Sequence, residues 1–97
     1  MQTYISLANW TELGIREVKN SPQRLDSAKA VARQFGGELV HFYMTMGEYD
    51  MAVVSEFPDE ASAAKFLLHV SKGGAVRMKT LKTFSEADYR EIMSGLG

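Results

Sequence analysis

Three residues near the middle of the chain carry side chains that could do chemistry together: His41, Tyr43 and Asp50. They flank Gly47-Glu48, and glycine at the first position of a two-residue loop is typical of a type II′ β-hairpin. This turn predicts a strand pairing in which all three side chains project from one face of a sheet. Such a row could abstract a proton beside a carbonyl group, or orient a phenolic substrate.

Each of these side chains also has a structural interpretation. Asp50 is either a general base or ligand anchor, or its carboxylate accepts hydrogen bonds from the hairpin or a neighbouring loop. We favour the structural role, because Asp beside a tight turn is common. An unperturbed histidine side chain can exchange a proton near neutral pH, which would suit a catalyst, but we favour an interface role in which His41 packs on Trp10 or Tyr43 of a second copy.

Trp10 and Arg77 complete the set of candidate ligand-binding residues. Trp10 ends the first expected strand and is placed on the same face as His41. Arg77 and Lys79 could bind an anionic ligand, although cations on an edge strand also prevent edge-to-edge aggregation, and we favour that role. No residue is assigned a catalytic role.

The composition limits the class of protein. The 97 residues predict one domain, 1–97, and the formal net charge of −1 gives no general attraction to nucleic acid or acidic lipid. The chain has no cysteine, which excludes disulfides and thiolate metal ligands within it. His41 and His69 lie on different elements and make no metal-site pattern. We expect a cytoplasmic protein without a metal, a cofactor, a nucleic-acid partner or a membrane span.

The order of the expected elements is βαββαβ followed by a short helix. The glycine pairs Gly36-Gly37 and Gly73-Gly74 end the two main helices, and both follow helices, whereas phosphate-binding loops precede them. This order predicts an α+β, ferredoxin-like sandwich, with four antiparallel strands and two helices on one face. The expected strands are 2–10, 38–46, 49–57 and 75–84; Ser21, Asp59 and Ser85 are expected to cap the helices, and 11–20 to form a packed turn that would cover a pocket.

The hairpin pairing also predicts which residues share each face. The helix-covered face is expected to carry Val40, Phe42, Met44, Met46, Tyr49, Met51 and Val53, joined by Ile5, Leu7, Val76 and Met78. The open face is expected to carry Leu39, His41, Tyr43, Thr45, Asp50, Ala52 and Val54, with Tyr4, Ser6, Ala8, Trp10, Arg77 and Lys79. Leu81 interrupts the alternation in the last strand, where we expect a bulge.

The expected open face is too apolar for a solvated monomer and too polar for a dry core. Monomeric proteins rarely expose such a patch. The sequence therefore predicts a homo-oligomer, most simply two sheets packed about a two-fold axis, with polar groups lining a cavity between them.

Several short motifs resemble those of the GYD domain family: Gly47-Glu-Tyr-Asp50 followed by Pro58-Asp59, with Thr11-Glu-Leu-Gly14 and Ser21-Pro-Gln-Arg24 before them. Gly36-Gly37, Val76-Arg77 and Phe84-Ser85 fit the same pattern, so the resemblance runs from the first strand to about Phe84. The resemblance implies a small ferredoxin-like protein of mostly unassigned function. The fold is also similar in outline to dimeric α+β barrel proteins, an analogy of fold alone.

Two functions of different classes remain. The first is a homo-oligomeric small-ligand-binding or regulatory module. The alternative is a cofactor-independent enzyme of the dimeric α+β barrel type, oxygenase-like or isomerase-like, that uses His41, Tyr43 and Asp50 with Arg77 as an anion anchor. A scaffold that assembles through a dry sheet face is a third interpretation.

Overall fold

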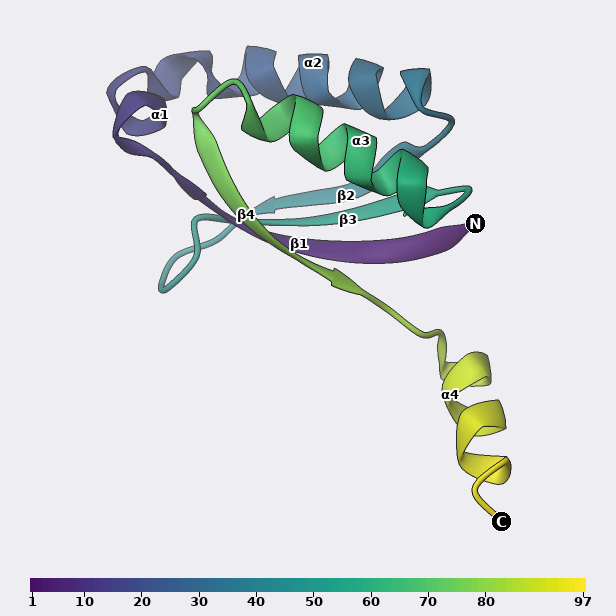
Figure 1. Ribbon diagram of the computed structural model, residues 1–97. Helices are drawn as coiled ribbons and strands as arrows, with labels where there is room; N and C mark the ends of the chain where they lie inside the picture. The colour runs from purple at the N-terminus through teal and green to yellow at the C-terminus, as the bar shows by residue number, and fades with distance from the viewer.

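A computed structural model describes all 97 residues and arranges them as two helices packed on one face of a sheet (Figure 1). The strands are β1 (Gln2–Trp10), β2 (Glu38–Met44), β3 (Met51–Phe57) and β4 (Val76–Lys82). The helices are α1 (Glu12–Arg16), the 3-10 helix η1 (Val18–Asn20), α2 (Ser21–Gln34), α3 (Glu60–Ser71) and α4 (Glu86–Ser94).

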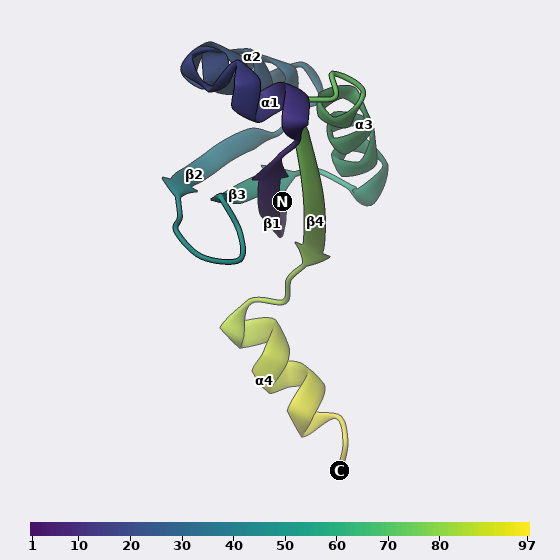
Figure 2. The same cartoon turned by 90° about the vertical axis from the view of Figure 1, so that its left-hand side faces the viewer.

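All neighbouring strands are antiparallel, in the order β2-β3-β1-β4. Helices α2 and α3 cover one face, and α4 projects away from the sandwich beyond the end of β4 (Figures 1 and 2). The ferredoxin-like α+β fold predicted from the order of the elements is confirmed.

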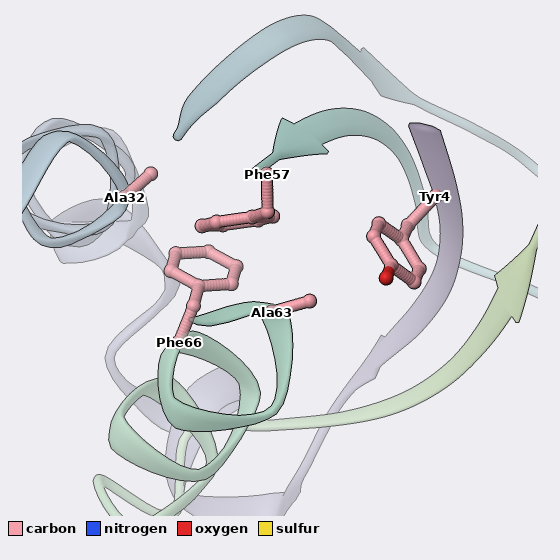
Figure 3. Close-up of a cluster of buried hydrophobic side chains, with 5 residues drawn as sticks. All are labelled: Tyr4, Ala32, Phe57, Ala63 and Phe66. Atoms are coloured by element: carbon pink, nitrogen blue, oxygen red, sulfur yellow. The ribbon is translucent and has the colours of Figure 1, made fainter. Parts of the chain in front are cut away.

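The packed core lies where α2 and α3 meet the beginning of β1 and the end of β3 (Figure 3). Phe57, at the end of β3, is the largest fully buried side chain, and its ring lies 5.2 Å from that of Phe66. Ala32 of α2 and Ala63 of α3 bring the helix backbones close to these rings. The α2 residues that pack here, Ala28, Val31 and Ala32, recur at helical spacing, so one apolar stripe of the helix faces the sheet.

The prediction for the faces of β1 was wrong. Tyr4, Ser6 and Ala8 are buried beneath the helices, and Ile5 and Leu7 point to the open face. Tyr4 can be buried because its ring packs edge-on against Phe57 and its hydroxyl group donates to Gln2 Oε1 at 2.7 Å. Ser6 is buried with its hydroxyl group 2.9 Å from that of Thr80, so the polar atom is satisfied.

The second correction concerns the hairpin. The predicted pairs from His41–Val54 to Met44–Met51 are confirmed, but the strands end at Met44 and Met51 instead of running to a two-residue turn. One further bond, from Thr45 N to Asp50 O at 2.7 Å, closes a longer loop. The loop opens because Asp50 turns toward β1, where its backbone N donates to Ala8 O at 2.9 Å.

Several side chains assigned to the helix-covered face are not buried beneath the helices. Met44 is exposed, and Met46 in the loop is 95% exposed. A bulge between Leu39 and His41 turns Leu39 toward the helices and leaves Val40 exposed, the reverse of the prediction. The bulge predicted in β4 is absent: its register to β1 is continuous, and Leu81 lies exposed on the open face.

The helix boundaries follow the predicted signals with one shift. Asp59 caps α3 and Ser85 caps α4, as predicted, but Asn20 and not Ser21 precedes α2, with Pro22 in its first turn. The connection 11–20 forms α1 and η1, and the Thr11 side chain caps α1 by accepting from Gly14 N at 3.2 Å. This segment packs beside the start of β4, because Thr11 N donates to Ala75 O at 3.0 Å.

The cap of α3 gives a testable pH dependence. Ser62 N donates to Asp59 Oδ1 at 2.7 Å, and this bond lowers the pKa of the Asp59 carboxyl group below its ordinary value of 3.8. A lowered folded-state pKa stabilises the protein above pH 3.8, and the stabilisation is lost as the pH falls through the folded value.

We therefore expect Asp59→Asn to unfold at a lower temperature than the wild type at neutral pH, since Asn caps the helix without the charge that favours its N-terminus. The difference should shrink between neutral pH and a second pH below 3.8, chosen as the lowest at which the wild type stays folded, because the carboxyl group takes up its proton as the pH falls through its lowered pKa. Thermal unfolding followed by circular dichroism at the two pH values measures it. An equal difference at both would show that the charge of Asp59 contributes nothing.

Candidate functional site

The open face of the sheet carries an apolar centre between two different edges. The strand registers define two rows across it, His41–Val54–Ile5–Leu81 and Tyr43–Ala52–Leu7–Lys79. The inner members of both rows are aliphatic. The β2 edge carries the rings of His41 and Tyr43, and the β4 edge carries Leu81 and the cationic Lys79.

The structure brings together only part of the set of five candidate residues. The rings of His41 and Tyr43 stack 6.2 Å apart on edge strand β2, and both side chains are exposed. Arg77 lies on the opposite edge strand, β4, where it pairs with Asn9. His41 and Tyr43 thus form one exposed pair, and Arg77 lies on the far edge of the sheet, with β3 and β1 between them.

Asp50 is bonded to the end of β1. Its Oδ2 accepts from Trp10 N at 3.0 Å, while its own backbone N donates to Asn9 Oδ1 at 3.1 Å. These bonds hold the 45–50 loop against β1, which agrees with the structural interpretation of Asp50. The side chain of Trp10 lies on the helix side, so its placement on the open face was wrong.

A cavity of about 540 Å³ lies between the helices and the sheet, on the side that the sequence analysis assigned to a packed core. Its floor consists of residues from all four strands, and its roof and sides come from α1, η1, α2 and α3. Fifteen of its 24 lining residues are hydrophobic. Small residues account for the space, because Ser6 and Ala8 of β1 face Ala28 of α2 across it.

Two buried polar atoms of this lining have no hydrogen-bond partner in the chain, Trp10 Nε1 and Arg24 Nη1. The other terminal nitrogen of Arg24, Nη2, donates to Glu17 O at 3.1 Å and lies 3.6 Å from Glu17 Oε2. The guanidinium group is therefore held from one side. Buried donors without partners are rare in folded proteins, so these two mark the cavity as a candidate binding site.

The cavity was not predicted from the sequence, although Trp10 was a candidate residue and the 11–20 segment was expected to cover a pocket. Leu13, Glu17 and Asn20 of that segment do line the cavity, but beneath the helices. The available signal was the alternation of Ser6 and Ala8 with Ile5 and Leu7: the small side chains face the helices and leave room there.

The shifted pKa values arise away from the cavity, where α3 begins beside β1 and β4. Burial raises the pKa of Tyr4, and the nearby Glu60 carboxylate adds to this effect. A 2.8 Å hydrogen bond to Glu60 Oε1 raises the pKa of Lys82. No group of three or more acidic, histidine or cysteine side chains is placed to hold a metal ion, and no helix has the length and apolarity to cross a membrane.

Comparison with known proteins gives one close curated relative. The "Glutamine synthetase and cystathionine beta-lyase binding protein" of Thermus thermophilus is 33% identical over 89 residues, which are 91% of this chain and 94% of that protein.

Two solved regulatory proteins share the fold at low sequence identity. A feast or famine regulatory protein of M. tuberculosis, complexed with L-methionine, matches 88% of this chain with a TM-score of 0.67 and 12% identity. An AsnC family transcriptional regulator of Agrobacterium tumefaciens matches 88% with a TM-score of 0.58 and 19% identity. The chain spans 51% of the length of each.

The resemblance carried by the short motifs extends over almost the whole chain. The model of the GYD domain matches residues 4–93, from the first strand into α4. Together with the Thermus relative, this match shows that the chain belongs to the GYD domain family.

Proposed function

We propose that this chain is a cytoplasmic, homo-oligomeric module that binds a small ligand or regulates another protein, and that it assembles through its open sheet face. The main support for this proposal is the apolar centre of that face. Ile5, Leu7, Ala52 and Val54 lie side by side there, and no element of the same chain covers them (Figure 1). A second copy is the simplest cover, because one self-complementary patch closes a two-fold dimer.

Helix α4 supports the same conclusion. It projects from the sandwich (Figure 2), and its Tyr89, Ile92 and Met93 are exposed at helical spacing. An amphipathic helix with no surface of its own chain to pack on is suited to pack against another chain. We propose that α4 extends the interface with the second copy.

The relatives support a binding role rather than a reaction. The name of the Thermus relative describes a protein that binds two enzymes, and the two solved neighbours are regulators, one of them complexed with an amino acid. We propose that this chain likewise acts by binding. Its ligand or partner would change the activity of another protein.

Native mass spectrometry of protein purified from its own host under gentle conditions tests this function. We expect a dimer or a multiple of the dimer, with the bare 10.8 kDa chain after denaturation. The difference between the native mass and the summed mass of the chains would give the mass of any ligand that copurifies. A monomer at all concentrations up to about 100 μM would contradict the proposal, since stable dimers bind more tightly than this.

A further inference from the structure

We propose that the helix-side cavity binds an apolar carboxylate, whose carboxylate oxygens accept hydrogen bonds from Trp10 Nε1 and Arg24 Nη1. This inference rests on the proposed binding function and names the site and the class of ligand. The site is distinct from the open sheet face, where the sequence analysis placed the ligand.

The two free donors determine the head group of the ligand. Both nitrogens are buried and belong to residues that line the cavity, neither has an acceptor in the chain, and Arg24 carries a permanent positive charge. A carboxylate offers two acceptor oxygens, and its negative charge is attracted to the guanidinium group, which Glu17 pairs from the Nη2 side alone. A cationic or purely apolar ligand would leave both donors buried and unpaired, at a cost in affinity.

Arg24 is positioned for this role. Glu17 holds Nη2 through its backbone oxygen and, at 3.6 Å, through its carboxylate, so Nη1 is held in a fixed direction. Trp10 is fixed at its backbone by the bond from its N to Asp50 Oδ2. The guanidinium group of Arg24 is therefore oriented before any ligand arrives, which lowers the entropic cost of binding.

The side chains that line the cavity indicate that the rest of the ligand is apolar. The inner lining is aliphatic and aromatic, with Leu25 and Val31 of α2 opposite Phe42 and Val53 of the sheet. At about 540 Å³ the cavity is within the range of small-molecule sites. An aryl-substituted or branched alkyl acid fits these walls, and a sugar or a nucleotide, which would bury many hydroxyl groups without partners, does not.

The same chemistry is found in simple carboxylic acids and in apolar amino acids. The rim distinguishes them, because Glu17, Asn20 and Gln23 are exposed side chains on the border of the cavity and could accept from an ammonium group. Titrations with 4-phenylbutyrate and with L-phenylalanine separate the two sources. Tighter binding of the amino acid would assign an ammonium site to the rim, and tighter binding of the simple acid would assign none.

Trp10 is the only tryptophan of the chain, so its fluorescence reports on the cavity directly. We expect either acid to shift the emission of the full-length protein in a saturable way, and 4-phenylbutanamide, a neutral match, to bind at least about tenfold more weakly. Equal binding of acid and amide would overturn the carboxylate assignment. No saturable binding of either acid by fluorescence and calorimetry would overturn the site.

Two variants on α2 test the location. Ala28→Leu adds a side chain inside the cavity, and the matched Ala30→Leu adds the same side chain to the exposed side of the helix. We expect Ala28→Leu to weaken binding at least about tenfold while the protein stays folded, because the added group fills space that the ligand needs. Ala30→Leu should bind like the wild type. Equal affinities of the two variants would exclude the cavity as the site.

Arg24→Gln tests the charge. Hydrogen bonds to charged groups contribute more than neutral ones, so we expect about tenfold or greater loss for the acid and little change for the amide. Equal loss for both would indicate a structural role for Arg24. The oligomeric state measured on the same samples separates this inference from the proposed function: oligomers without a cavity ligand refute only the inference, and a monomer that binds the acid refutes only the assembly.

Discussion

Gly14→Ala is expected to lower the free energy of unfolding by about 1–3 kcal/mol, the usual range for an added group in a packed position. A Cβ atom at this position would overlap the carbonyl oxygen of Ala75, because α1 lies directly against the backbone at the start of β4. The same carbonyl oxygen accepts from Thr11 N at 3.0 Å. The substitution must therefore separate α1 from β4 and break this bond.

Gly73→Ala is the matched control, because an added Cβ there meets only Val70 O at an ordinary 3.4 Å. We expect it to unfold near the wild-type denaturant concentration in a urea titration. Leu13 and Ala75 line the cavity, so Gly14→Ala should also weaken binding of 4-phenylbutyrate. Equal stability of the two variants would contradict the close contact between α1 and β4.

The helices were predictable because each carries a complete set of local signals. Pro22 in the first turn of α2 and Asp59 before α3 mark their beginnings, and Gly36, with φ of +80°, ends α2 in a conformation that glycine favours. Their apolar stripes have the helical period and point to one surface. Such signals involve residues only a few positions apart, so no knowledge of the sheet is needed.

The faces of β1 were not predictable by the same reasoning. Alternation divides the strand into two sets, but hydrophobicity decides which set faces the helices only if one face of the sheet is wet. Here Ile5 and Leu7 lie on an apolar open face, while the smaller Ser6 and Ala8 face the helices. The apolar side chains of the open face therefore reversed the assignment.

The candidate residues were likewise predictable only in part. The sequence places His41, Tyr43 and Arg77 on the open face, and the structure finds them there, because the register from Met44–Met51 to His41–Val54 was predicted. Trp10 belongs to β1, whose faces were assigned in reverse, and its side chain therefore lies on the helix side. The cavity could not be predicted, because its volume depends on how far α2 stands from the sheet, and strand or helix periodicity does not contain that distance.

Leu7→Glu should convert the proposed oligomer into monomers without unfolding the chain. Leu7 lies in the apolar centre of the open face, between Ala52 and Lys79 in the strand register. A glutamate there can pair with Lys79 on its own sheet, so the isolated monomer tolerates it. In a sheet-to-sheet interface the same carboxylate is buried, at a cost of about 3–5 kcal/mol, which weakens association more than a hundredfold.

The matched control is Leu68→Glu, because Leu68 is 72% exposed on α3 and belongs to the helix side of the molecule. Light scattering after size exclusion, at several protein concentrations, measures both variants beside the wild type. Loss of the oligomer in Leu7→Glu alone assigns the interface to the open face, since both variants add one negative charge. If both remain oligomeric, the chain assembles through another surface, and exposed α4 would then carry the interface without the sheet. Dissociation by both would indicate that net charge, and not the site of the charge, controls assembly.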